Sequence, residues 1–295
     1  MLLLMSHQLL LCQTLELLIN TTQEFSNIID ATIYHENIFL LNSREQPAVN
    51  VYNLEGKYIR GIELVSSNYV SPRFRRIEVM DNKIFVLNRQ QLEVYNLSGT
   101  AIWDTSFSFY PNDVISSRDT IFLVGLLDDD IIFHTIDLVD NKITNSFGKY
   151  PVDDIEKSVK KLPLVAETDG LDFIINSLNG FGLLQLHDNR FIEFVRLDTL
   201  RYIPSFIENV AGRGRYYARP SGINGIAISN EYIVFSTYTV SPDDRLYYIV
   251  IYDRQSNRIY SLNKYDMMYI VTSIYDDNLV YLIGGDNNIY LLRIS

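Results

Sequence analysis

The strongest constraint on the fold of this chain is a pattern that recurs six times along its 295 residues. Each copy is a polar turn followed by a short apolar run. The copies are HENIFLLN from His35, DNKIFVLN from Asp81, RDTIFLVG from Arg118, DGLDFIIN from Asp169, NEYIVFST from Asn230 and DDNLVYLIG from Asp276. Asp, Asn, Glu or Gly before an apolar run is typical of a tight turn into a β-strand. The pattern therefore predicts six equivalent strands, spaced by about fifty residues.

A second element follows each of the first five runs and reads as strand, turn, strand. Examples are VNVYNLEGKYIRGI from Val49 and LEVYNLSGTAIWDT from Leu92. The predicted turns are Glu55-Gly56, Ser98-Gly99, Asp140-Asn141, Asp198-Thr199 and Gln255-Ser256-Asn257. Gly, Asn and Asp tolerate the positive φ that hairpin turns need. Four antiparallel strands per repeat predict an all-β fold, a six-bladed β-propeller with one four-stranded blade per repeat.

The two ends of the chain complete this prediction. The last repeat offers only three strands, in MMYIVTSIY, NLVYLIG and NIYLLRIS. The missing strand is expected from LELLINT near the N-terminus, so that Leu15 to Ile19 pairs in the last blade and closes the ring. Residues 14–295 are thus predicted to form a single propeller domain.

Residues 1–13 leave two alternatives open. They are an N-terminal extension, or a degenerate signal or lipoprotein segment in which Cys12 would be lipidated. The apolar stretch is too short to span a membrane, no Lys or Arg precedes it, and Leu11 stands where a lipoprotein signal has a small residue. A membrane tether is expected only if Cys12 is lipidated. Because Cys12 is the sole cysteine, an intramolecular disulfide is excluded.

The repeats carry a resemblance to a known group. The unit IFLLN…VNVYNLEGKYI, the opening LELLINTTQEFSNIIDATIYHENIFLLN and the segment FGKYP at Phe147 to Pro151 resemble the TolB-like six-bladed propellers of Bacteroidetes. That resemblance implies the same fold, a largely unassigned function and a cell-envelope location as a periplasmic or surface lipoprotein. If residues 1–12 are not a signal, the expected location is cytoplasmic. Some relatives have a Gly-Pro-Gly-Glu stretch where this chain has SSNYVSPRF, and the repeats of TolB itself are missing, so its partners are not carried over.

Charge and motif content exclude several function classes. The formal net charge of −11 opposes general binding of nucleic acid. No Gly-x-Gly-x-x-Gly, Walker or nucleophile-elbow motif occurs, the four histidines lack near neighbours, and the acidic runs lack calcium-loop spacing. We therefore predict no catalytic residue, no metal site and no cofactor. A channel metal built from single residues of different blades would leave no local spacing.

Two arginine-bearing segments are the predicted ligand sites. The insertion from Tyr202 to Gly222, with its flank, carries Arg201, Arg213, Arg215, Tyr216, Tyr217 and Arg219. Arginine and tyrosine together suit an anionic or carbohydrate ligand; the alternative is an internal salt-bridge hub. The segment YVSPRFRR carries Arg73 and Arg75, with Arg76 on the other side of an extended chain. One of these arginines is expected to point into the channel, and the alternative is a solvated or ion-paired loop.

The leading hypothesis is a non-catalytic propeller that binds a small molecule or a protein at the channel mouth. One alternative is a metal-assisted hydrolase or lyase, or a glycan-active enzyme, with side chains converging from several blades. A third is a purely structural interaction module, which would present a large apolar patch.

Overall fold

The computed structural model of the protein describes residues 14–20, 28–42, 47–65, 75–117, 119–127, 131–149, 166–168, 172–177, 180–185, 190–196, 207–209, 215–217, 223–240, 245–256 and 258–294. Every regular element in these ranges is a β-strand, as the repeats predict. No described helix has the length and apolar character needed to cross a bilayer.

The described strands form six antiparallel sheets of four strands and one of two. Sheet 1 contains β2 (Ile28–Tyr34), β3 (Asn37–Asn42), β4 (Val49–Asn53) and β5 (Tyr58–Ile62). Sheet 2 contains β6 (Arg76–Met80), β7 (Lys83–Asn88), β8 (Gln91–Asn96) and β9 (Ala101–Ser106). Sheet 3 contains β10 (Asp113–Ser117), β11 (Thr120–Leu127), β12 (Ile131–Asp137) and β13 (Lys142–Lys149).

Three more four-stranded sheets follow along the chain. Sheet 4 contains β14 (Ala166–Thr168), β15 (Asp172–Ser177), β16 (Gly180–Gln185) and β17 (Arg190–Arg196). Sheet 5 contains β20 (Ile223–Ile228), β21 (Tyr232–Val240), β22 (Arg245–Asp253) and β23 (Arg258–Tyr265). Sheet 6 contains β24 (Tyr269–Tyr275), β25 (Leu279–Gly284), β26 (Ile289–Arg293) and β1 (Thr14–Ile19). The two-stranded sheet pairs β18 (Ile207–Asn209) with β19 (Arg215–Tyr217).

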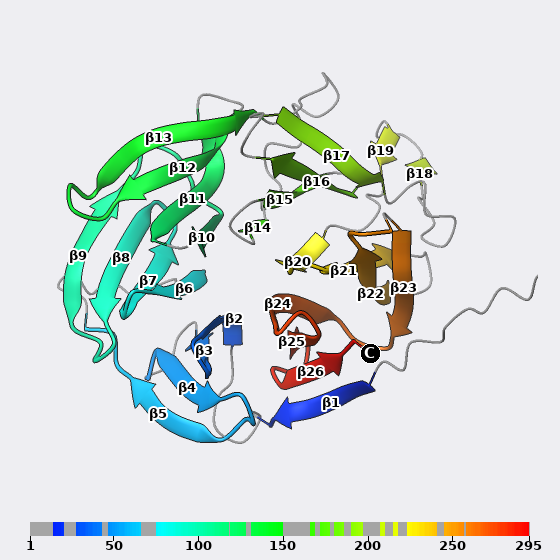
Figure 1. The fold of residues 1–295 in the computed structure, drawn as a ribbon, viewed down its shortest axis with the longest axis horizontal. Coiled ribbons are helices and arrows are strands. Elements are labelled where there is room, and N and C mark those ends of the chain that lie inside the picture. Colours follow the sequence, from blue (N-terminus) through cyan, green and yellow to red (C-terminus); the bar gives the residue numbers. More distant parts are fainter. Residues whose placement is uncertain are drawn as a thin grey trace, which may run out of the picture.

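The six four-stranded sheets are arranged around a common centre (Figure 1). The first strand of each repeat, β2, β6, β10, β14, β20 or β24, lies innermost, and the strand order within each sheet then runs outward. Each inner strand contacts the inner strand of the next sheet, and β24 contacts β2. The inner strands therefore surround the centre, where a cavity can form.

Sheet 6 combines strands from both ends of the described chain. Its outermost strand is β1, which pairs antiparallel with β26, with Leu15 opposite Leu292 and Leu17 opposite Tyr290. A long-range ion pair between Glu16 Oε1 and Arg293 Nε, 3.6 Å apart, accompanies this pairing. The predicted pairing of Leu15 to Ile19 in the last sheet is confirmed by this register.

The turns form where the sequence places Gly, Asn and Asp. Gly56, Gly99 and Asn141 have positive φ values of 79°, 86° and 55°, which confirms three of the predicted hairpin turns. An acceptor side chain at the end of the third strand stabilises several of these turns: Asn53 Oδ1 accepts a bond from the Lys57 N–H and Asn96 Oδ1 one from the Thr100 N–H. The predicted Asp198-Thr199 turn lies outside the described residues.

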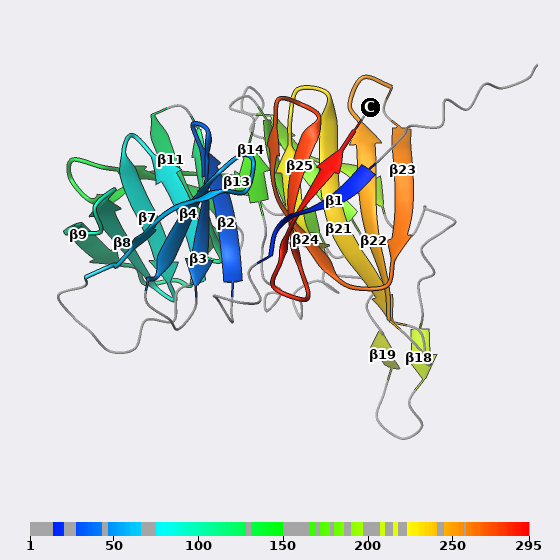
Figure 2. The same cartoon turned by 90° about the horizontal axis from the view of Figure 1, so that it is seen from below.

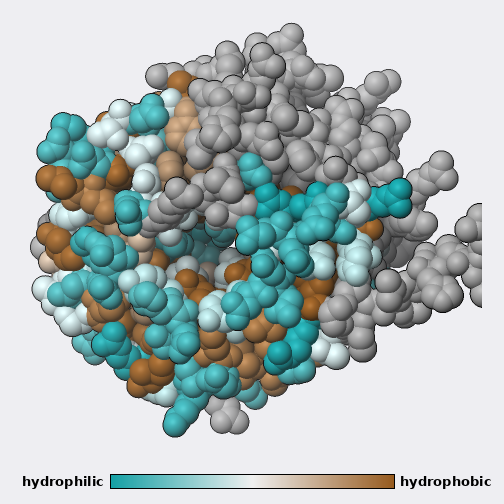
Figure 3. Space-filling model, in the orientation of Figure 1, coloured by the Kyte–Doolittle hydropathy of each residue, from teal (hydrophilic) through white to brown (hydrophobic). Residues whose placement is uncertain are grey.

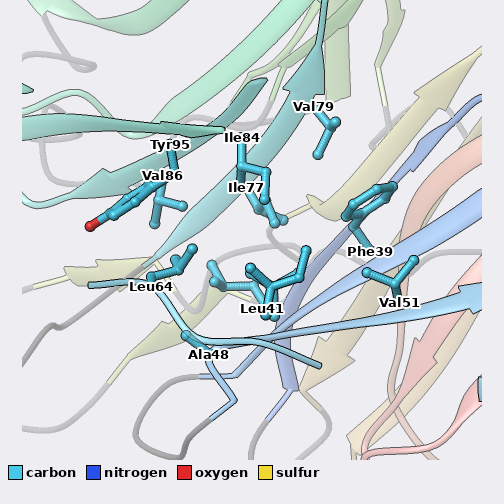
Figure 4. Packing of buried hydrophobic residues seen from close by; sticks show 12 residues of the cluster. Phe39, Leu41, Ala48, Val51, Leu64, Ile77, Val79, Ile84, Val86 and Tyr95 are labelled. Atoms are coloured by element: carbon cyan, nitrogen blue, oxygen red, sulfur yellow. The ribbon is translucent and has the colours of Figure 1, made fainter. Parts of the chain in front are cut away.

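The core lies between neighbouring sheets. The aligned repeat positions, occupied by Phe39, Phe85, Phe122, Phe173, Val234 and Val280, are all buried. Figure 4 shows one such layer, where Phe39, Leu41 and Val51 of sheet 1 meet Ile77 and Val86 of sheet 2. The apolar pattern thus recurs along the chain because each sheet buries its faces against the two sheets beside it.

Sheets 5 and 6 approach each other closely at their inner strands. A Cβ added to Gly225 of β20 would lie 2.1 Å from the carbonyl oxygen of Val271 in β24. The Val271 N–H donates to Ser236 Oγ at 3.3 Å, which links the same two sheets. Glycine is therefore required at residue 225 by the approach of the two backbones.

Candidate functional site: the central cavity

A cavity of about 450 Å³ lies at the centre of the molecule. Described residues from all six inner strands line it, from Asp30 and Thr32 of β2 round to Val271 and Thr272 of β24. The face seen in Figure 3 is hollowed near its centre, with hydrophilic residues around the hollow. Small-molecule sites typically have volumes of about 300–1,000 Å³, so this cavity is large enough for one.

Three charged residues occupy equivalent places on successive inner strands. Asp30 of β2 lies opposite Leu41, Arg76 of β6 opposite Leu87, and Asp113 of β10 opposite Val124. Leu41, Leu87 and Val124 are each two residues after the aligned repeat phenylalanine. The repeat geometry therefore places an acid, a base and an acid side by side at one level of the cavity wall.

These three residues bridge four sheets. Arg76 Nη1 lies 3.7 Å from Asp30 Oδ1, and Arg76 Nε lies 3.2 Å from Asp113 Oδ1. Asp30 Oδ2 also accepts a bond from the Ile77 N–H at 2.9 Å, and Asp113 Oδ2 accepts one from the Ala166 N–H at 3.2 Å. The carboxylates thus pair with Arg76 and with backbone groups, which satisfies polar atoms that would otherwise be buried without partners.

Two glutamates also lie on this wall. Glu78 accepts hydrogen bonds from Ser116 Oγ at 2.6 Å and from Thr32 Oγ1 at 3.3 Å. Glu167 Oε1 accepts a bond from the Thr168 N–H at 3.0 Å. Both glutamates line the cavity with Asp30, Arg76 and Asp113, so this wall holds four carboxyl groups and one guanidinium.

Burial raises the pKa of all four of these carboxyl groups. Burial raises the pKa of Asp30 to about 7 although Arg76 opposes the shift, and it raises the pKa of Glu78 to about 8 although Ser116 donates to it. Burial also raises the pKa of Asp113, again against Arg76. The pKa of Glu167 is raised well above its usual value, first by burial and then by the neighbouring charge of Glu78. At neutral pH the raised pKa of Glu78 therefore favours its protonated form.

The opposite wall has a different character. It is formed by β20 and β24 and includes Ile226, Ala227, Ile228, Ile270 and Val271, and its hydroxyl groups belong to Thr272, Ser273 and Tyr275. None of its described lining residues is Asp, Glu, Lys, Arg or His. The Ser273 hydroxyl is buried and has no hydrogen-bond partner. The cavity is thus polar and ionisable on one side and largely apolar on the other.

Only some of the arginines predicted as ligand-binding residues lie in the described part of the chain. Arg73, Arg201, Arg213 and Arg219 lie outside the described residues. Arg75 is exposed directly before β6, and its backbone N–H donates to the Leu87 carbonyl oxygen at 2.9 Å. Of the YVSPRFRR arginines that the structure describes, Arg76 lines the cavity and Arg75 does not.

Arg215, Tyr216 and Tyr217 form strand β19. This strand pairs with β18, with Arg215 opposite Asn209 and Tyr217 opposite Ile207. Figure 2 shows this small hairpin standing away from the four-stranded sheets. The predicted insertion therefore contains a hairpin of its own between β17 and β20.

The sequence reasoning missed Asp30, Glu78, Asp113 and Glu167. Each of the four comes from a different repeat, so no local sequence motif joins them. Within the described part of the chain, no three His, Cys, Asp or Glu side chains are placed to hold a metal ion. His134 is fully buried in sheet 3, where its ring nitrogens contact Ser146 Oγ and the Gly125 carbonyl oxygen, both at 2.9 Å.

No family model matches the sequence, and no curated protein matches it. Solved structures are similar to it in fold. Hydrazine synthase from Kuenenia stuttgartiensis aligns with a TM-score of 0.59 at 11% identity, over 92% of this chain and 78% of that one. The WD40 domain of Neurospora crassa Pan2 aligns with a TM-score of 0.54 at 8% identity, over 95% of both chains. The chain is a β-propeller.

A further similar structure is the extracellular domain of BT4673 from B. thetaiotaomicron. It aligns with a TM-score of 0.53 at 14% identity, over 95% of this propeller and 40% of that chain. The propeller thus spans about two-fifths of that structure. At such identities these likenesses establish the fold, with four-stranded antiparallel blades, and nothing about the ligand.

Proposed function

We propose that this propeller is a non-catalytic binding module whose small-molecule ligand occupies the central cavity. The observation that carries the proposal is the cavity itself, which all six inner strands line and which joins a charged wall to an apolar one. Pockets of this size with a few converging polar groups are the usual ligand sites of proteins. Among the described lining residues the one guanidinium, that of Arg76, already pairs with Asp30 and Asp113, so an anionic ligand fits this cavity poorly.

A cavity-filling variant tests this function. Ser273→Phe places a ring against the cavity without removing a hydrogen bond, because the Ser273 hydroxyl has no partner. A matched control is Thr144→Phe, on the exposed side of β13. A small-molecule panel screened by thermal shift should give hits that Ser273→Phe abolishes and Thr144→Phe retains. Hits that survive Ser273→Phe would refute the cavity as the site.

We propose that the six sheets are the six blades of one closed ring formed by residues 14–295, with 1–13 as a separate extension. Support comes from the pairing of β1 with β26 and from the contact between β24 and β2. Closure from both ends gives the last sheet its fourth strand and covers the outer edge of β26.

We propose the Arg/Tyr insertion as a second contact surface, for an anionic ligand or the charged part of a partner. Its support is compositional: Arg201, Arg213, Arg215 and Arg219 lie in or beside a segment with a single acid, Glu208. Replacing Arg215 and Arg219 by alanine together should weaken binding of such a ligand while leaving the melting temperature unchanged. Equal losses of binding and stability would favour the salt-bridge hub.

We propose a cell-envelope location and kinship with the TolB-like propellers of Bacteroidetes. The quoted repeat segments support the kinship, and the likeness to an extracellular domain from B. thetaiotaomicron is consistent with the location. Fractionation and metabolic lipid labelling test this: label lost on Cys12→Ser would support a lipoprotein, and protein found only in the cytoplasm would refute it.

A further inference from the structure

The cavity walls specify what kind of ligand could make good contacts there. On the polar wall, Asp30 and Asp113 already have their partners, in Arg76 and in the Ile77 and Ala166 N–H groups. A ligand carrying a positive charge would compete with Arg76 for the same two carboxylates. A negatively charged ligand would have to compete with Asp30 and Asp113 for Arg76, the guanidinium that they already pair with.

The groups that remain for a ligand are neutral donors and acceptors. Thr32 and Ser116 carry hydroxyls and already donate to Glu78, which leaves their acceptor lone pairs. Glu78 and Glu167 can donate as well as accept while they hold protons. On the other wall the Thr272 hydroxyl donates to the Tyr281 carbonyl oxygen at 3.0 Å and keeps its acceptor lone pairs. A ligand with several hydroxyl groups would match this dense mixture of donors and acceptors.

The apolar wall adds a second requirement. Ile226, Ala227, Ile228 and Ile270 are among the residues that line the cavity on the side of β20 and β24. A compact ligand with hydroxyls on its rim and C–H groups on one face would contact both walls at once. A volume of about 450 Å³ accommodates one or two sugar rings.

On the basis that the cavity is a binding site as proposed above, we propose that its ligand is an uncharged, hydroxyl-rich small molecule, such as a mono- or disaccharide, held by the carboxyl groups of Glu78 and Glu167 and the hydroxyls of Thr32 and Ser116. Binding then depends on pH, because a charged glutamate can no longer donate and adds to the repulsion within the cluster. The ionisable groups facing Glu78 are Asp30, Arg76, Asp113 and Glu167, with His35 and Tyr275 at the far end of the cavity. With a pKa of about 8 for Glu78, the competent protonated form falls to about one-tenth at pH 9.

The experiment uses glucose, galactose, mannose and maltose as neutral probes, glucuronate as the anionic one and glucosamine as the cationic one. Saturation-transfer NMR and calorimetry are run on the full chain at pH 6 and pH 9. We expect at least one neutral sugar to bind, with about ten-fold weaker affinity at pH 9 than at pH 6. Glu78→Gln, whose amide mimics the protonated acid, should bring that ratio close to one. Glu63→Gln, at an exposed site outside the cavity, should keep it.

The outcomes separate this inference from the proposed function. Cavity binding by glucuronate or glucosamine alone, abolished by Ser273→Phe, would overturn the ligand class while the binding function stands. Neutral-sugar binding with the same affinity at both pH values in the unmodified protein would overturn the role of the protonated glutamates. Failure of every probe, neutral and charged, would count against the proposed function itself.

Discussion

Loss of the Arg76 charge is expected to destabilise the propeller through electrostatics. Among the described residues of the polar cavity wall Arg76 is the only Lys or Arg, and it lies 3.2 Å from Asp113 Oδ1 and 3.7 Å from Asp30 Oδ1. Its side chain is 19% exposed and that of Asp113 is 9% exposed, so solvent cannot replace it as a partner. Arg76→Met keeps the apolar stem and removes the charge.

Removing one partner of a buried ion pair costs about 3–5 kcal/mol, because the other charge remains buried without compensation. For a chain of this size, 1 kcal/mol corresponds to about 2–4 °C, so we expect the melting temperature to fall by about 10 °C at pH 8. Arg76 lowers the pKa of Asp30 and of Asp113, so both values rise further in the variant. Below those values the carboxyls accept protons and the penalty shrinks, so the loss should be clearly smaller at pH 5.

Thermal unfolding followed by circular dichroism at pH 5 and pH 8 measures both effects. Arg75→Met is the matched control, because Arg75 is exposed and contributes a backbone bond that the substitution retains. The triple change Asp30→Asn, Arg76→Met and Asp113→Asn should recover most of the loss, since it leaves no unpaired charge. If Arg76→Met has the same melting temperature as Arg75→Met at both pH values, the reasoning is refuted.

Three further predictions concern packing and closure. His134→Ala removes two buried hydrogen bonds and a ring contact with Phe109, so it should lower stability by about 2–4 kcal/mol in urea denaturation, independently of ligand. Gly225→Ala should destabilise strongly, because its Cβ would clash with the Val271 carbonyl oxygen, whereas Gly285→Ala, whose nearest neighbour lies at 3.4 Å, should be tolerated. Deleting residues 1–19 removes β1 and exposes the edge of β26, so size-exclusion chromatography should show aggregation that deletion of residues 1–11 does not cause; monomeric 20–295 protein would contradict this.

The sequence predicted the sheets and turns well because these depend on short segments. Gly56, Gly99 and Asn141 adopt positive φ where the turn chemistry requires it, and the buried aligned residues follow the apolar runs. The pairing of Leu15 with Leu292 was predictable for a different reason: three strands in the last repeat require a fourth from elsewhere.

The cavity wall was not predicted, and the reason is geometric. Asp30, Arg76 and Asp113 are separated by about forty residues each, so no spacing rule connects them. They come together because the repeat brings equivalent positions of successive inner strands to one level. In each of the first three repeats, one inner-strand residue pairs with the residue two positions after the repeat phenylalanine. An alignment of the inner strands on that pairing places Asp30, Arg76 and Asp113 in one column.

The pairing of β1 with β26 also has a consequence for how the chain folds during synthesis. Strands β1 and β26 of sheet 6 lie about 270 residues apart in the sequence, which gives this sheet the highest contact order of the described sheets. Sheets 1 to 5 are each built from consecutive segments and can form as the nascent chain emerges from the ribosome. Sheet 6 must wait until Arg293 has emerged, and until then β1 is an unpaired strand exposed to chaperones and to neighbouring nascent chains.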